Sequence, residues 1–247
     1  MIIRRKAQMK KILILLLVFC FIFTAQAEDK TNIQAGDIVL FGHYPQTMDG
    51  TDDTPIEWLV LNYDDVNHRV LLLSRYGIDC RQYDEGDGVT WETCNLRTWL
   101  NNDFLNRAFS KEERSAILLT EVDNSKSQGY SKFKRKGGKN TKDYLFLLSY
   151  SEANQYFGLK SFLDENPENV SARLKQTDYT QNKSKWLFTD NLTEDGSPSI
   201  PWWLRSPGDS KVLNCFVGAG GFLNHGNPSN YYGVRPAFWL DLDAANI

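Results

Sequence analysis

The apolar residues of this chain fall into short runs whose spacing changes twice along the sequence. Residues 37–41, 56–62 and 69–74 are strand-length runs, and the turn-rich residues 64–67 predict an antiparallel hairpin between the last two. From residue 94 to about residue 106 the apolar residues recur at helical spacing. Strand-length runs return near the C-terminus. This order predicts an α+β domain, a mixed α/β fold with helices between its strands.

Two further helices are predicted from their start signals. Ser110 with Glu113, and Ser149 with Glu152, each form a capping box, in which the hydroxyl and the carboxylate satisfy free backbone amides. Gly158 suits the left-handed residue that commonly ends a helix. A short helix is also expected at residues 172–175.

The N-terminus has the three parts of a secretory signal peptide. Basic residues precede an apolar run at Ile12–Thr24, and residues 25–27 supply the small-x-small pattern that predicts cleavage before Glu28. The run spans 13 residues, short of the roughly 20 that a membrane-spanning helix needs. An uncleaved anchor is the alternative. Lipidation at Cys20 is disfavoured because the bulky Phe19 precedes it.

Cleavage leaves residues 28–247 as one domain, with a β-rich start at 36–75, a helical middle at 94–160 and a C-terminal half at 200–242. Without residues 1–27 the chain has 23 Lys and Arg against 31 Asp and Glu, a net charge of −8. This charge argues against nucleic acid and anionic membranes as partners. No segment after the signal peptide is apolar enough to span a membrane.

Three cysteines follow the signal peptide. In an oxidising compartment Cys80 and Cys94 are close enough in sequence to form a disulfide, and two reduced core cysteines are the equal alternative. Cys215 has no evident partner, and we interpret it as a buried apolar residue rather than a nucleophile.

Local catalytic motifs are missing. His43, His68 and His225 have none of the usual metal-site spacings, and there is no phosphate-binding loop, nucleophile elbow or paired-cysteine zinc motif. We therefore predict no catalytic residue, no metal ligand and no cofactor. The acidic turns at 49–53 and 84–87 have the oxygen ligands that calcium prefers, but a solvated acidic loop is the favoured interpretation because the regular ligand spacing is absent.

The stretch from Gly218 to Gly233 has the composition of a recognition surface. Tyr offers a large amphipathic contact area at low entropic cost, while Asn and Ser offer adaptable hydrogen bonds. A plain surface loop held by Asn and Gly turns is the equal alternative. The candidate ligand-binding residues are Asn214, Phe222, Asn224, His225, Asn227, Ser229, Asn230, Tyr231 and Tyr232.

Two motifs flank that stretch and carry a resemblance. Trp202-Trp203-Leu-Arg205-Ser-Pro-Gly208 and Gly233-Val-Arg235-Pro-Ala-Phe-Trp239 resemble the C-terminal half of a C-type-lectin-like fold of the formylglycine-generating-enzyme branch. We expect the tryptophans to pack in the core and the two arginines to bond buried carbonyls or acids. Three earlier segments resemble an uncharacterised family of exported bacterial proteins with the same C-terminal motif. They are 41–47, 55–59 and 96–102.

The resemblance implies small twisted antiparallel sheets, two to three helices and long loops, with a ligand face formed by the C-terminal loops. The motifs of calcium-dependent sugar-binding lectins are absent, and so is the copper-binding cysteine pair of the formylglycine-generating enzymes. The leading hypothesis is an exported, non-enzymatic recognition protein that binds a protein or glycan outside the cytoplasm. The alternatives are an oxidoreductase like the formylglycine-generating enzymes, or its degenerate form, and a structural domain of the cell envelope.

Overall fold

The computed structural model describes residues 33–133, 135–184 and 190–245 of the chain. The expected signal peptide, residues 1–27, lies outside these residues. From Gln34 onward, the described residues group into one compact unit. Over the described ranges, every helix falls short of the length and apolar character that crossing a membrane would require.

The first sheet has five strands, all paired antiparallel. β1 (Ile38–His43), β2 (Pro55–Asp64) and β3 (Arg69–Ser74) follow one another, and β14 (Pro236–Asp241) and β7 (Phe146–Leu147) complete the order β1-β2-β3-β14-β7. The predicted hairpin between β2 and β3 is confirmed. The last of the described strands therefore lies between β3 and β7, inside the sheet that the first strands begin.

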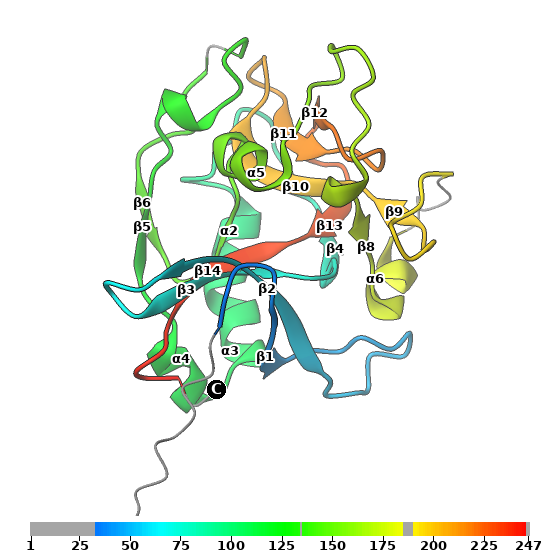
Figure 1. Ribbon diagram of the computed structural model, residues 1–247. Helices are drawn as coiled ribbons and strands as arrows, with labels where there is room; N and C mark the ends of the chain where they lie inside the picture. The colour runs from blue at the N-terminus through cyan, green and yellow to red at the C-terminus, as the bar shows by residue number, and fades with distance from the viewer. Residues whose placement is uncertain (1–32, 134, 185–189, 246–247) are drawn as a thin grey trace, which may run out of the picture. The chain divides into compact units, whose positions relative to one another are not determined.

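The second sheet is built mainly from the C-terminal part of the chain. Its order is β12-β11-β10-β13-β4, in which β10 and β13 are parallel and the other neighbours are antiparallel. In Figure 1 it lies above the first sheet, and the chain passes from β13 directly into β14. The strand bounds are β4 (Asp79–Arg81), β10 (Trp202–Pro207), β11 (Asn214–Val217), β12 (Leu223–Gly226) and β13 (Tyr232–Val234).

The helix predicted from residue 94 to about residue 106 is confirmed, with a change of pitch inside it. It consists of α2 (Asn95–Trp99), one π-helical turn η1 (Leu100–Phe104) and α3 (Leu105–Ala108). The expected periodicity places its apolar residues on one buried face. Those that are buried are Leu96, Leu100, Phe104, Leu105 and Ala108.

Both predicted capping boxes are present, at the starts of α4 (Lys111–Ala116) and α5 (Tyr150–Phe157). In each, the serine hydroxyl accepts from the backbone amide three residues on, and the glutamate carboxylate accepts from the serine amide. Gly158 ends α5 in the left-handed conformation, with φ 63°. The boxes are Ser110 with Glu113 and Ser149 with Glu152.

The prediction of a helix at residues 172–175 is wrong. A short 3₁₀ turn, η3 (Val170–Ala172), ends at the first of these residues. The chain then forms the strand β8 (Leu174–Lys175), because its backbone pairs with β9 (Ser199–Ile200). The helix of this region is α6 (Asp178–Lys183), which begins at a threonine cap.

The polar stretch between the helices is closed by a two-stranded ladder of β5 (Thr120–Val122) and β6 (Thr141–Asp143). It contains one 3₁₀ turn, η2 (Lys126–Gln128). With these elements the domain is a mixed α+β fold of small sheets, as predicted.

The aromatic residues fill the core in several clusters, including one at each five-stranded sheet. Beneath the first sheet, the rings of Trp58 and Phe238 meet edge to face with centroids 4.7 Å apart. In the second sheet, Trp203 is fully buried and its ring lies 4.6 Å from that of Tyr232. Such pairs add about 0.5–1.5 kcal/mol each to the stability gained by burial. The high aromatic content is thus largely used for packing.

The three described cysteines are buried free thiols. Of the two alternatives for Cys80 and Cys94, the structure therefore shows the reduced thiols, and Cys94 Sγ caps α2 by accepting from the amide of Arg97 at 3.4 Å. Burial raises the pKa of Cys80 and of Cys94 to about 12, and it also raises the pKa of Cys215.

We therefore expect none of these three thiols to react with iodoacetamide in the native protein at neutral pH, because the thiolate is the reactive form. After unfolding in guanidinium without reductant, all three should be alkylated, as counted by mass spectrometry of peptides. Alkylation of Cys215 alone would instead demonstrate a disulfide between Cys80 and Cys94.

Candidate functional site

A cavity of about 500 Å³ opens between β4, the start of the helical segment and α6. Its volume lies within the range of small-molecule sites, roughly 300–1,000 Å³. We call it the β4 cavity. Its lining residues include Asp79, Arg81, Gln82, Glu85, Asn95, Trp99, Asp103, Lys183 and Tyr231.

Asp79 is a fully buried carboxylate in the wall of this cavity. Both of its oxygens accept from Lys183 Nζ at 3.0 Å, and Oδ2 also accepts from Tyr44 Oη at 3.1 Å. Oδ1 accepts from the backbone amide of Cys80 at 2.7 Å. Burial and the charge of Asp79 raise the pKa of Tyr44, so its phenol remains a donor. Asp79 is saturated with donors, as a buried carboxylate must be.

Arg81 is held in place by two neighbours. Its Nε lies 3.4 Å from Asp79 Oδ2, and its guanidinium carbon lies 3.9 Å from the centre of the Trp99 ring. The side chain keeps 37% of its surface exposed. Among the described residues, neither terminal nitrogen of Arg81 has a hydrogen-bond or ion-pair partner.

Several polar side chains of the β4 cavity are likewise unpaired within the described part of the chain. Glu85, Asn95 and Asp103 are exposed and make no side-chain hydrogen bond there. Tyr231 is 47% exposed and its hydroxyl has no partner in the same residues. The cavity therefore offers both donors and acceptors to a ligand.

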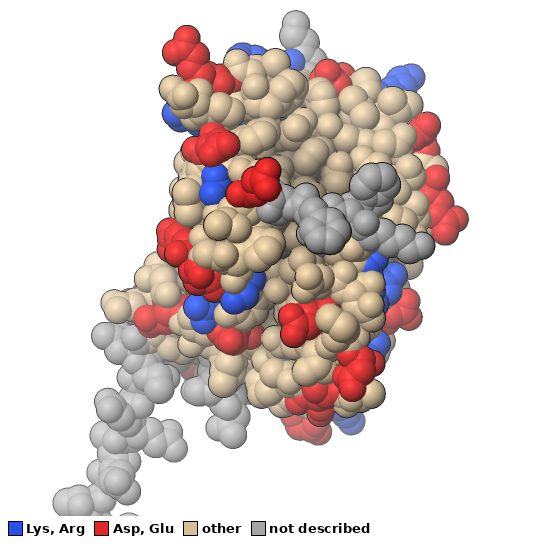
Figure 2. Space-filling view, turned by 90° about the vertical axis from the view of Figure 1, so that its right-hand side faces the viewer, with Lys and Arg blue, Asp and Glu red and all other residues tan. Residues whose placement is uncertain are grey.

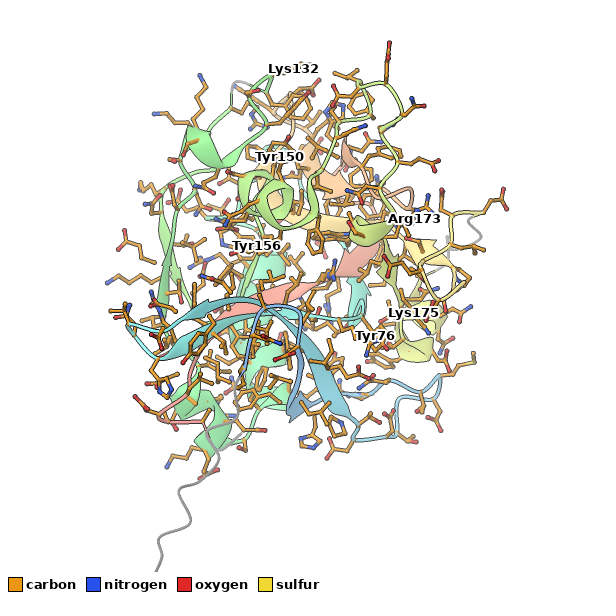
Figure 3. The ribbon with its side chains drawn as sticks, viewed as in Figure 1. Tyr76, Lys132, Tyr150, Tyr156, Arg173 and Lys175 are labelled. Carbon is orange, nitrogen blue, oxygen red and sulfur yellow. The ribbon has the colours of Figure 1, made fainter. Side chains whose placement is uncertain are left out.

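A second cavity, of about 450 Å³, lies beside β8. We call it the β8 cavity. Figure 3 shows Tyr76 beyond the end of β3 close to Lys175 of β8, with Arg173 just above them and Tyr156 on α5. All four side chains line the cavity.

The cations of the β8 cavity are already paired. Arg173 Nη2 bonds Glu168 at 2.9 Å, and its other nitrogens donate to the carbonyls of Leu192 and Gly220. Lys175 Nζ bonds Asp195 at 2.8 Å. The third cation of this cavity, Arg75, is paired too, with Glu57 at 2.5 Å. Because these pairs satisfy its cations, the β8 cavity offers less to a charged ligand than the β4 cavity does.

Charges are mixed on the face that carries β8, β9 and α6. Figure 2 shows acidic and basic side chains interspersed there, with no single basic patch over the described residues of that face. Binding to nucleic acid would need a cluster of basic residues.

The stretch 218–233, expected as a loop, contains β12 and most of β13. Four of the nine predicted ligand-binding residues therefore lie in strands of the second sheet: Asn214, Asn224, His225 and Tyr232. Of the nine candidates only Ser229 and Tyr231 are exposed. Asn214 is 1% exposed, and Phe222, Asn224, His225, Asn227, Asn230 and Tyr232 are half-buried.

Local contacts explain the polar candidates. Asn227 Oδ1 accepts from the amide and hydroxyl of Ser229, which closes a turn, and Asn230 Nδ2 donates to Tyr232 Oη at 2.9 Å. Asn224 Oδ1 accepts from the amide of His225 at 2.8 Å. Tyr231, by contrast, lines the β4 cavity.

His225 is enclosed by aromatic rings. Its ring lies 5.1 Å from Phe133 and 5.3 Å from Phe162, and its Nδ1 is 3.4 Å from Asp209 Oδ1. Cys215 is buried, as predicted, with its thiol donating to the carbonyl of Pro207.

The flanking motifs pack the second sheet against its neighbouring segments. Trp202 Nε1 donates to the carbonyl of Ala172, and Trp203 Nε1 to that of Arg81. Gly233 is buried on β13, where an added Cβ would lie 2.7 Å from the side chain of Ile200. A larger residue at this position would therefore have to displace the Ile200 side chain.

The two motif arginines have different surroundings. Arg205 forms a two-pronged pair with Glu152 and donates to the carbonyls of Leu147 and Asp123. Arg235 Nε donates to the carbonyl of Ser74, and its Nη1 has no partner among the described residues. Its guanidinium lies against two aromatic rings, and burial lowers its pKa to about 9.

The acidic turns considered for calcium are occupied by hydrogen bonds. Asp52 accepts from the amides of Gln46 and Thr47, and Asp84 from those of Gly86 and Asn95. Within the described ranges, no group of three or more His, Cys, Asp or Glu side chains is arranged to hold a metal ion.

Sequence reasoning missed the centre of the β4 cavity. Asp79 and Lys183 are 104 residues apart, and no local motif connects them. The available signal was a strand of three residues, Asp79–Arg81, with two opposite charges on one face.

Comparison with known proteins identifies a family. No curated protein and no solved structure matches the chain significantly. One family model, described as a domain of unknown function (DUF6273), matches residues 67–242, which include the whole second sheet. The match covers more than half of the chain, so this protein belongs to the DUF6273 family.

Proposed function

We propose that this protein is a non-enzymatic binding protein that holds a glycan in the β4 cavity, outside the cytoplasm. The observation that carries the proposal is the set of unpaired donors and acceptors around one aromatic-walled cavity. Sugar hydroxyls are both donors and acceptors, and they bind where amide, carboxylate and guanidinium groups meet aromatic side chains.

The proposed location of the protein outside the cytoplasm rests on its sequence. The basic, apolar and small-residue parts of residues 1–27 are typical of a signal peptide. The two tryptophan and arginine motifs resemble the ligand-face half of C-type-lectin-like domains of the formylglycine-generating-enzyme branch. Relative to the sequence-based hypothesis, the proposed ligand face moves from the 218–233 stretch to the β4 cavity, with Tyr231 common to both.

Binding to a printed panel of neutral, carboxylated and sulfated oligosaccharides tests the proposal. We expect at least one class to bind the wild-type protein, and Tyr231→Ala to weaken that binding by about tenfold or more, the effect of removing a central aromatic contact. Affinities would be measured by isothermal titration calorimetry with the best oligosaccharide of the panel.

Tyr144→Ala is the matched control, because Tyr144 is 37% exposed and lies outside both cavities. It should leave the affinity unchanged. The proposal is wrong if no oligosaccharide binds at millimolar concentration, or if the Tyr144 and Tyr231 variants lose binding equally.

A further inference from the structure

We propose that Arg81 is a carboxylate-binding residue, and that the ligand of the β4 cavity is an acidic sugar with a single carboxylate. This inference rests on the proposed function and names the chemical class of its ligand. It depends on how Arg81 is held, on which of its nitrogens are free, and on the charges that surround it.

The orientation of Arg81 is fixed from two sides. Strand β4 pairs antiparallel with β13, and the strand alternation places Arg81 on the same face as Asp79. Asp79 engages only the Nε atom, while Trp99 lies against the plane of the guanidinium at 3.9 Å. The side chain therefore loses little further freedom when a ligand binds.

The free edge of Arg81 matches a carboxylate. Its two terminal nitrogens are unpaired among the described residues and belong to a side chain that lines the cavity. A guanidinium presents such nitrogens in a planar fork, which pairs with both oxygens of a carboxylate through two parallel hydrogen bonds. No rearrangement of Arg81 is needed for this contact.

The charge balance leaves Arg81 available to an anion. Lys183 contacts both oxygens of Asp79 at 3.0 Å and so offsets the charge of that carboxylate. Among the charged residues of the lining, this leaves Arg81 with Glu85 and Asp103, which together carry a net charge of −1. Any excess of positive charge is therefore confined to the terminal nitrogens of Arg81, and the exposed Glu85 and Asp103 disfavour a ligand with more than one anionic group. A sugar with one carboxylate and otherwise neutral hydroxyls fits this arrangement.

The test compares a uronic-acid oligosaccharide with its neutral counterpart, in which the carboxylate is reduced to the alcohol. We expect the wild-type protein to bind the acidic form at least about tenfold more tightly, since a hydrogen-bonded charge pair contributes that much or more. Arg81→Gln should remove the preference and leave the weaker affinity for the neutral form. Arg81→Lys should restore it only in part, because an ammonium lacks the planar fork.

Arg75→Gln is the control, because Arg75 belongs to the β8 cavity and is paired with Glu57. It should keep the full preference. Unaltered thermal melting would show that the Arg81 variants are folded. The wild-type protein could instead bind both sugars equally, with Tyr231→Ala still weakening that binding. This result would overturn the role of Arg81 and leave the proposed function standing. Absence of binding to either sugar and to the whole panel would instead reject the proposed function.

Discussion

Among substitutions of a single glycine by alanine, Gly221→Ala is expected to destabilise this protein the most. Gly221 has φ +83°, and a Cβ there would lie 1.8 Å from the carbonyl oxygen of Asn169. A left-handed conformation costs a non-glycine residue roughly 1–2 kcal/mol, and overpacking adds roughly 1–3 kcal/mol. Because the blocking atom is backbone, we expect the upper part of that sum, roughly 4–5 kcal/mol.

Gly196→Ala separates the two contributions. Gly196 has φ +79°, almost the same conformation, but nothing lies within 4 Å of its added Cβ. Its substitution should therefore cost only the conformational part, roughly 1–2 kcal/mol. Urea unfolding followed by tryptophan fluorescence measures both. Equal losses in the two variants would show that the contact between Gly221 and Asn169 does not constrain the fold.

Gly221 lies in the 218–233 stretch, for which the sequence suggested ligand binding. The amide of Asn169 donates to the carbonyl of Gly220 at 2.9 Å, and the amide of Gly221 donates to that of Gly218 at 2.8 Å. The glycines at 218–221 thus form a tight turn against the 169–173 segment. Their small size serves close packing, which explains a glycine-rich composition without a ligand.

Arg205→Met is expected to lower the free energy of unfolding by about 3 kcal/mol. Removing one partner of a buried ion pair costs roughly 3–5 kcal/mol of stability, and we expect a value near the lower end of that range. Arg205 is 2% exposed, whereas Glu152 is 30% exposed and would regain some hydration. The substitution also leaves the carbonyls of Leu147 and Asp123 without this donor. Urea unfolding measures the change.

The control is the same substitution at an exposed pair. Arg75 is 48% exposed and bonds Glu57, so Arg75→Met should cost less than about 1 kcal/mol. Glu152→Gln should have an intermediate effect, because a glutamine still caps α5 at the amide of Ser149 but carries no charge. A loss at Arg205 no larger than that at Arg75 would contradict a stabilising role for the buried arginine.

Arg205 illustrates what a motif can and cannot reveal. An arginine next to two tryptophans in an apolar segment predicts a buried cation that needs acceptors. Its actual partners come from α5, from β7 and from the segment that precedes η2, more than 50 residues away. The need for acceptors was visible in the sequence, whereas the identity of the acceptors was not.

The same distinction applies to the candidate site. Asn and Tyr residues in 214–232 suggested a recognition loop because composition alone does not distinguish a loop from strands with polar turns. Residues 223–226 of this stretch pair with β11 and residues 232–233 pair with β4, and most of its Asn and Tyr side chains are at least half-buried. Tyr231 remains exposed at 47% because it lies just before β13 begins.

The sequence by itself determined the elements whose signals are local: the β2–β3 hairpin, the helical segment after Cys94, the two capping boxes and the left-handed end of α5. Each depends on residues within a few positions of one another, so their chemistry is readable from the order of residues. Only the tertiary structure decided the β4 cavity, the free state of the cysteines and the packing of the 218–233 stretch. These features depend on contacts between segments about 50 to 150 residues apart, such as Asp79 with Lys183 or Gln82 with Ser229. Such contacts form only because burying apolar surface brings the two sheets together, and a sequence pattern does not specify which distant side chains that burial makes neighbours.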